Sequence, residues 1–394
     1  MDGLKNMDRS KPLPTELEPI ITLATSALGE LCPAGPPRSH DEGHALLLSS
    51  RTAASRDLPE YYLIYFLLVD LLGYYHLGQW EKVAWVIPIR YKDRLYSLEH
   101  RKFGIGIFAP THEPNANASG TPSEDAETDA RDIAIVINKA VAVASPYFKW
   151  RAEQAVLTSD LNVSNKSTEL FDRYVYFRNQ FQELQIRSTQ TKDWALVHQI
   201  RREAKWSGQA AIDAFFSWTE HVFIHLAILL GRKITGAEVA DLARDEWKNK
   251  FKAALDLSNN EAKRHYDVLL VLREQIRNFM AHGAFGKKGE AFNFHSGAGA
   301  VPVLLTSNHK GDYAFTGHSE FDEDTAIKEI ESFILHLWTG VRAPAREHIF
   351  SSLPSIISYA ADGTYAAAMK TESKMADFVN HLLMQFDNAS NMDW

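Results

Sequence analysis

The chain has little of several features that would settle its class at once. It has one cysteine among 394 residues, so Cys32 can form neither an internal disulfide bond nor a cysteine-based zinc site. Its most apolar run, Tyr61 to Leu72, contains Asp70 and is shorter than the roughly 20 residues of a membrane-spanning helix. The N-terminus lacks the apolar segment of a signal peptide. We therefore expect a soluble cytoplasmic protein with no membrane partner.

The chain also lacks an excess of positive charge. The 42 lysine and arginine residues face 50 acidic residues, which gives a net charge of -8. This balance argues against a surface built to coat nucleic acid or anionic lipid, but it allows a local basic site. A hydrophobic content of 45% and a charged content of 23% are typical of a folded globular protein. The length is sufficient for more than one hydrophobic core.

The N-terminal part of the sequence predicts a mixture of helices and strands. Asp57 and Pro59 favour a helix start before the buried run Tyr61 to Leu72. Residues 82–89 and 95–110 are rich in β-branched and aromatic residues and predict a strand pair.

Two further N-terminal segments complete this part. Residues 111–128 have the composition of an exposed loop. Residues 131–144 fit either a buried helix or a strand, and we favour the helix. From residue 167 onward, long segments with helical periodicity dominate, and they are interrupted by strand-forming sequence at about residues 290–318.

One segment, VLREQIRNFMAHGAFG at residues 271–286, combines three groups suited to RNA chemistry. At 100° per residue, Asn278 and His282 share a helix face, whereas Arg277 lies about 140° from His282 and has a long side chain. An imidazole can move a proton near neutral pH, a guanidinium can hold a phosphate with two hydrogen bonds, and an amide can orient either group. A metal-free ribonuclease needs these groups.

The sequence Arg277-Asn278-x3-His282 resembles the signature of the HEPN superfamily, Arg-x4-6-His. In this signature four to six residues separate the arginine from the histidine, and the residue directly after the arginine is polar. The resemblance covers about residues 207–342. It implies a helical bundle that forms a homodimer with two facing motifs. Many members are metal-independent endoribonucleases of toxin, antiphage defence and RNA-processing systems. The strand-forming segment is an insertion relative to compact members, so we expect an inserted β-hairpin.

The resemblance also implies a role for each motif residue. His282 would assist attack of a ribose 2′-OH on the adjacent phosphate, Arg277 would stabilise the phosphorane charge, and Asn278 would position His282 or the phosphate. The products would be a 2′,3′-cyclic phosphate and a 5′-OH. We expect no cofactor and no metal. Candidate supporting groups are Glu220 near the motif, and Arg273, Lys287 and Lys288 as contacts to RNA phosphates.

The sequence thus predicts an α+β protein that is predominantly α. We divide it into an N-terminal α+β module (1–148), a helical connector (149–206), a HEPN-like bundle (207–345) and a helical C-terminal tail (346–394). The role of the first module is open, and a regulatory partner or ligand there is one option. Basic residues also gather around its strand pair, where RNA contact and a solvated face are both open: Arg90, Lys92, Arg94, Arg101 and Lys102.

Three other interpretations of the C-terminal half stay open. The bundle could be a non-catalytic scaffold that binds RNA or only dimerises. Asn278 and His282 could merely cap a helix end while Arg277 pairs with an acid. His221 and His225 have the i, i+4 spacing of two metal ligands, which would suit a metal hydrolase, although no third ligand is obvious.

Overall fold

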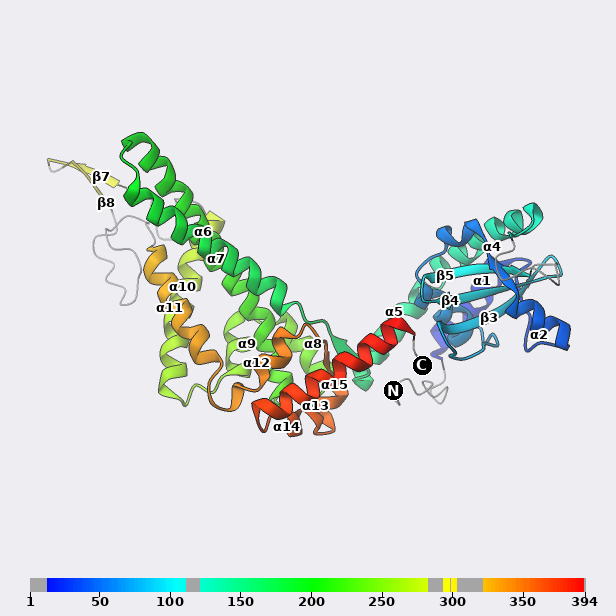
Figure 1. The fold of residues 1–394 in the computed structure, drawn as a ribbon. Coiled ribbons are helices and arrows are strands. Elements are labelled where there is room, and N and C mark those ends of the chain that lie inside the picture. Colours follow the sequence, from blue (N-terminus) through cyan, green and yellow to red (C-terminus); the bar gives the residue numbers. More distant parts are fainter. Residues whose placement is uncertain (1–12, 111–120, 283–292, 298, 303–321, 393–394) are drawn as a thin grey trace. The chain divides into compact units, whose positions relative to one another are not determined.

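A computed structural model describes residues 13–110, 121–282, 293–297, 299–302 and 322–392 (Figure 1). For 275–282, 293–296 and 299–302 it describes the backbone. The chain forms two compact units, one of Met1–Gln154 with Leu383–Trp394 and one of Ala155–Leu382. The predicted α+β class with mostly helix is confirmed. Among the described residues, no helix is both long and apolar enough to cross a membrane.

The first unit is built on a five-stranded antiparallel sheet in the order β1-β3-β4-β5-β2. Its central hairpin turns at Lys92 and Asp93, which both have positive φ. The expected second strand at 95–110 is divided in two, because the chain turns again before Gly104, whose φ is 95°. The strands are β1 (Cys32–Pro33), β2 (Ser49–Arg51), β3 (Val83–Tyr91), β4 (Arg94–Arg101) and β5 (Gly104–Pro110).

Helices pack against this sheet and bury its apolar residues. Ile133 and Ile137 of α4 share a core with Ile87, Leu98 and Ile107 of the sheet. The helical segments are η1 (Thr15–Leu17), α1 (Glu18–Leu28), α2 (His40–Leu47), η2 (Ala53–Asp57), α3 (Tyr61–Tyr65), the π-helical η3 (Phe66–Leu71), α4 (Glu124–Val143) and α5 (Ser145–Thr158).

Two N-terminal expectations need correction. The helix α3 begins at Tyr61 without a side-chain cap, so Asp57 is not its N-cap. The expected loop at 111–128 already contains the start of α4 at Glu124. There Ser123 Oγ accepts a hydrogen bond from Ala126 N, and acidic residues occupy the first turn, where the helix dipole favours negative charge. The open choice at 131–144 is settled as helix.

The second unit is a helical bundle around an aromatic core. Its longest helices, α6 and α7, lie side by side (Figure 1). Trp218, Phe223, Trp247, Phe251 and Phe333 are buried in its centre. The helices are α6 (Ser167–Gln190), α7 (Trp194–Leu229), α8 (Gly236–Arg244), α9 (Trp247–Ala254), α10 (Asn260–His282), α11 (Glu323–Leu337), η5 (Gly340–Arg342), α12 (Ala345–Phe350), α13 (Ile357–Ala361), α14 (Thr364–Ala368) and α15 (Glu372–Asn391). The residues of α15 from Leu383 onward belong to the first unit.

Short strands complete this unit. β6 (Asn162–Val163) pairs with β9 (Ser355–Ile356), and β7 (Asn293–Ser296) pairs with β8 (Gly299–Pro302). The second pair is an antiparallel hairpin between α10 and α11, where the sequence predicts an inserted one. The expected connector forms α6 and the first part of α7, and its Tyr174 and Phe181 are buried in the bundle core.

Candidate active site

The backbone of the motif lies at the C-terminal end of α10. Asn259 Oδ1 accepts a hydrogen bond from Ala262 N at the start of this helix, and the described part of the helix runs to His282. The side chains of Arg277, Asn278 and His282 lie outside the described part of the structure, as do Lys287 and Lys288 entirely. The helical backbone places positions 278 and 282 about 40° apart around the axis, as the spacing predicts.

Arg273 lies one turn before Arg277 on nearly the same helix face, because four residues rotate the helix by about 40° beyond a full turn. Its Nη2 is 2.8 Å from Glu220 Oε1 of α7. The other oxygen of that carboxylate, Oε2, is 3.2 Å from Lys250 Nζ of α9. Two of the predicted residues, Glu220 and Arg273, therefore meet, and Lys250 is a third member that the sequence did not single out.

The three ionic groups differ in their exposure to solvent. The Lys250 side chain is 7% exposed, whereas those of Arg273 and Glu220 are 28% and 36% exposed. A nearly buried ammonium group needs a charged partner, because desolvation of an unpaired ion is costly. The Glu220 carboxylate thus neutralises the nearly buried ammonium of Lys250 through Oε2, and it pairs with the more exposed guanidinium of Arg273 through Oε1.

The position of Glu220 is fixed by packing next to it. Thr219 Oγ1 accepts a hydrogen bond from Trp247 Nε1 at 3.0 Å, and both residues are fully buried. This bond joins α7 to the first turn of α9, which also carries Lys250. α8 and α9 are separate helices, and the break between them at Asp245 and Glu246 lets α9 turn toward α7.

The start of α11 brings a second carboxyl group to the same end of the bundle. Arg264 pairs with Glu329, and Glu261 pairs with His336, so α10 and α11 run antiparallel. The N-terminal turn of α11 therefore lies beside the C-terminal half of α10, and it carries Glu323.

Glu323 is buried, and burial raises its pKa although Gln209 Nε2 donates a hydrogen bond to its Oε1 at 3.0 Å. A carboxyl with a raised pKa is suited to proton transfer. In the sequence this residue marks only a helix start, and nothing in its local pattern separates a buried acid from the usual acidic first turn. It is a site candidate that sequence reasoning missed.

The pair His221 and His225 joins segments of the bundle. Their Nε2 atoms are 3.0 Å apart, His225 Nδ1 is 2.7 Å from Ser355 Oγ, and the backbone N–H of Lys166 donates to His221 Nε2 at 2.8 Å. Burial lowers the pKa of both histidines, and that of His225 falls well below its ordinary value. Within the described residues, no third ligand completes a metal site with this pair.

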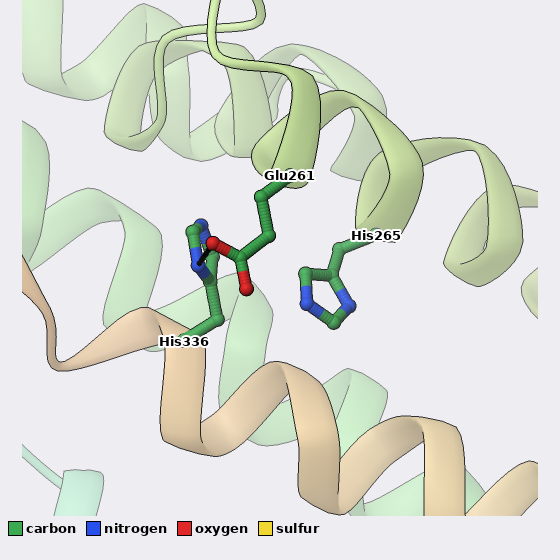
Figure 2. Close-up of side chains that lie close together, drawn as sticks. All are labelled: Glu261, His265 and His336. Atoms are coloured by element: carbon green, nitrogen blue, oxygen red, sulfur yellow. Dashed lines mark ion pairs between the residues drawn. The ribbon is translucent and has the colours of Figure 1, made fainter.

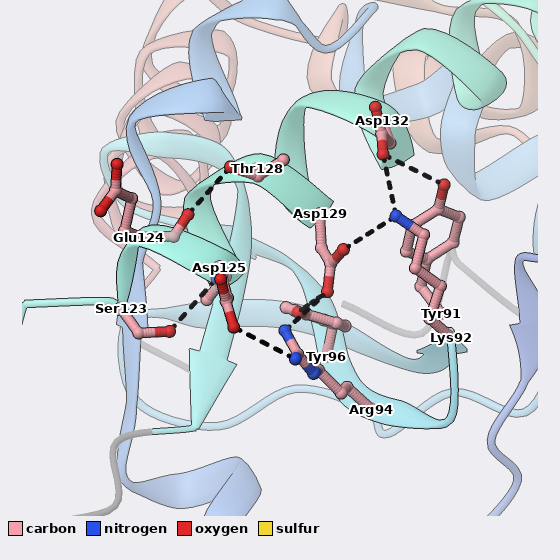
Figure 3. Close-up of polar contacts among 11 residues, drawn as sticks. Tyr91, Lys92, Arg94, Tyr96, Ser123, Glu124, Asp125, Thr128, Asp129 and Asp132 are labelled. Atoms are coloured by element: carbon pink, nitrogen blue, oxygen red, sulfur yellow. Dashed lines mark hydrogen bonds and ion pairs between the residues drawn. The ribbon is translucent and has the colours of Figure 1, made fainter.

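The basic residues of the first unit are held in ion pairs. Lys92 lies 3.1 Å from carboxylate oxygens of both Asp129 and Asp132, and Arg94 contacts Asp129 and Asp125 (Figure 3). Arg90 pairs with Glu42, and Arg101 pairs with the buried Glu99, while Lys102 Nζ binds Asn391 Oδ1. The contacts of Arg90, Lys92 and Arg94 attach the sheet to α2 and α4, whereas the pair of Arg101 and Glu99 lies within β4.

Comparisons with family models, curated proteins and solved structures gave no match to this chain.

Proposed function

We propose that the second unit is a metal-independent endoribonuclease of the HEPN type, whose site is Arg277, Asn278 and His282. The observation that carries the proposal is that the backbone of Arg277-Asn278-x3-His282 is helical in the last described turns of α10, which puts positions 278 and 282 on one helix face. A defence or toxin role is the context that the resemblance suggests.

The contacts upstream of the motif support this proposal. Glu220 and Lys250 tie Arg273 to α7 and α9 one turn before Arg277. An active site needs its helix held in place, because misplacement of a reacting group by about 1 Å can reduce the rate on the order of a hundredfold. The pair also assigns Arg273 a positioning role, since its guanidinium is already engaged with a carboxylate.

The proposed reaction is an internal phosphoryl transfer. His282 removes the proton from a ribose 2′-OH, the O2′–P bond forms, and the P–O5′ bond breaks. The departing 5′ oxygen takes up a proton, and the products are a 2′,3′-cyclic phosphate and a 5′-OH. Arg277 stabilises the charge that develops on the phosphorane oxygens, and Asn278 orients the imidazole or the phosphate.

The proposal includes a homodimer. A single chain supplies one histidine from the motif, but the reaction uses both a base and an acid. Two facing motifs supply two histidines and two arginines around one phosphate. We therefore expect the rate per chain to rise with protein concentration until the dimer is complete, and sedimentation should show the dimer over the same range.

The test is cleavage of a labelled RNA by the purified full chain in EDTA. We expect the wild type to cleave and His282→Ala and Arg277→Ala to lose at least a hundredfold in rate, in line with loss of a general base or of an electrostatic stabiliser. An RNA with 2′-deoxyribose at the cleaved position should be resistant. His198→Ala and Lys263→Ala are matched controls, because both residues are exposed and lie outside the motif sequence.

The outcome also distinguishes the catalytic proposal from a scaffold. If wild type and His282→Ala cleave at the same rate, the activity belongs to a contaminant and the catalytic proposal fails. If the wild type binds RNA or dimerises without cleaving it, and the motif variants do the same, the bundle is a non-catalytic scaffold.

A further inference from the structure

Two imidazoles and a carboxylate meet at the opposite end of α10 from the motif. Glu261 lies in the first turn of α10, His265 one turn later, and His336 in the last turn of α11. One ligand atom from each residue lies within 4.8 Å of the others. Figure 2 shows the three side chains pointing toward one another, with the Glu261 carboxylate between the two rings. Among the described residues this is the group with the make-up of a metal site.

The two histidines are buried and the carboxylate is exposed. His265 is 1% exposed and His336 is 7% exposed, whereas the Glu261 side chain is 65% exposed. The cluster therefore has a nearly dry interior side and one ligand that faces solvent. A cation can reach this site from water without unfolding the bundle.

The present hydrogen bonds of the two rings are weak. Both ring nitrogens of His265 lie 3.4 Å from Arg264 Nη2, near the outer limit for a hydrogen bond. His336 Nδ1 is 3.2 Å from Glu261 Oε2, and its Nε2 is 3.4 Å from Arg342 Nη2. A cation bound through Nδ1 would shift the ring proton to Nε2. Arg342 would then keep its two bonds to backbone carbonyl oxygens, at 2.9 Å each.

The protonation state of the rings also suits a metal. Burial, with a contribution from Arg264, lowers the pKa of His265 to about 4, and burial with Arg342 lowers that of His336. A lowered pKa favours the neutral imidazole, which is the form that binds a metal.

We propose that Glu261, His265 and His336 form a binding site for a divalent transition-metal ion, with zinc as the best match. Two nitrogens and one carboxylate oxygen are a ligand set that zinc accepts, and water would complete four-coordination. Donor atoms about 2 Å from one zinc ion lie roughly 3.3 Å apart, whereas the present ligand atoms lie within 4.8 Å of one another, so the side chains need to close by up to about 1.5 Å. The ion would clip the first turn of α10 to the last turn of α11.

This site is separate from the proposed nuclease site. Sixteen residues of α10 separate Glu261 from Arg277, which corresponds to about 24 Å along the helix. The inference therefore does not rest on the proposed function, and metal binding, not RNA cleavage, is its readout.

The experiment measures zinc binding to the full chain after EDTA treatment and removal of the chelator. We expect one zinc per chain by equilibrium dialysis with elemental analysis. Zinc should raise the melting temperature, since a ligand that binds the folded state stabilises it. Added Co²⁺ should give the visible absorption of a four-coordinate ion. Glu261→Gln should weaken zinc binding at least tenfold, and His265→Ala or His336→Ala should abolish it.

The matched control is Glu274→Gln, which removes an exposed carboxylate from the same helix outside the cluster and should bind zinc like the wild type. Because the Glu261 side chain is exposed, Glu261→Gln tests the site even if the histidine variants fail to fold. Absence of stoichiometric zinc in the wild type would overturn the proposal, as would a Glu261→Gln protein with wild-type affinity.

Discussion

Glu220 of α7 and Arg273 of α10 form an ion pair in which Oε1 and Nη2 are 2.8 Å apart. The same carboxylate binds the nearly buried Lys250 of α9, so one side chain joins three helices. The contacts of Glu220 therefore stabilise the bundle, and through Arg273 they also hold α10 in place one turn before Arg277.

We predict that Glu220→Ala destabilises the second unit by about 2 kcal/mol. The loss leaves the Lys250 ammonium without its carboxylate in a nearly buried position, and the partial exposure of Glu220 keeps the cost below that of a fully buried pair. Urea denaturation followed by far-UV circular dichroism measures the change. Asp213→Ala, an exposed acid on the same helix, is the control and should change stability by about 0.5 kcal/mol or less.

A double-mutant cycle separates the two contacts of Glu220. Combining Glu220→Ala with Arg273→Ala should give a coupling free energy of about 1 kcal/mol, because this pair is more exposed than the contact with Lys250. If Glu220→Ala behaves like the Asp213 control, the carboxylate does not hold the helices together.

Gly208 of α7 lies where the start of α11 approaches most closely. A Cβ atom at this position would lie 2.8 Å from Glu323 Cβ and 3.1 Å from Phe181 Cδ2. In an isolated helix Gly→Ala stabilises by about 1 kcal/mol, but overpacking costs typically about 1 to 3 kcal/mol. We predict a lower melting temperature for Gly208→Ala, measured by circular dichroism. A higher melting temperature would show that α11 can move aside without cost.

How far the sequence predicts this fold depends on the range of the interactions. The hairpin of β3 and β4 and the helical course of α10 as far as His282 were predicted because turn residues and periodicity are local signals. The edge strands β1 and β2 were missed. Each has only two or three residues, and they are strands because they pair with β3 and β5, far away in the sequence.

The residues of the candidate site likewise fall into two groups, those that the local sequence reveals and those that only long-range packing brings to the site. Arg277, Asn278 and His282 were found because they are close in the sequence, and Glu220 was singled out for its place on the preceding helix. Lys250 and Glu323 were missed, since their burial depends on the packing of α9 and α11 against α7. The proposed zinc site was missed for the same reason, because Glu261 and His265 are one turn apart but His336 comes from another helix.

Asp129 is the buried member of the ionic network in the first unit, and we predict that it dominates the network's stability. Burial alone would raise its pKa, but hydrogen bonds from Tyr96 and Lys92 outweigh burial and lower it. Asp129→Asn should cost about 1 kcal/mol because one acceptor serves several donors. Asp125→Asn removes an exposed partner and should cost under about 0.5 kcal/mol. Equal losses in urea denaturation would contradict this ranking.

The last prediction concerns the acid sensitivity of the second unit. His348 is fully buried between Tyr365 and Phe378, and neither of its ring nitrogens has a hydrogen-bond partner among the described residues. Burial lowers its pKa from 6.5 to about 4. The folded state therefore favours the neutral ring. The stabilisation that the neutral ring gives to the folded state is complete above pH 6.5, the pKa of histidine in the unfolded chain. It is lost progressively as the pH falls toward 4.

From these two values we expect His348 to reduce the free energy of unfolding by about 2 kcal/mol between pH 7 and pH 5. His225, whose pKa is lowered mainly by burial and also by His221 and His348, acts in the same direction. His348→Leu should remove the part due to His348 and should be neutral or stabilising at pH 7, because it also removes two buried nitrogens without partners. Urea denaturation at both pH values measures this. His198→Leu, at an exposed position, should keep the wild-type pH dependence, and an unchanged pH dependence in His348→Leu would show that the ring stays accessible to protons in the folded unit.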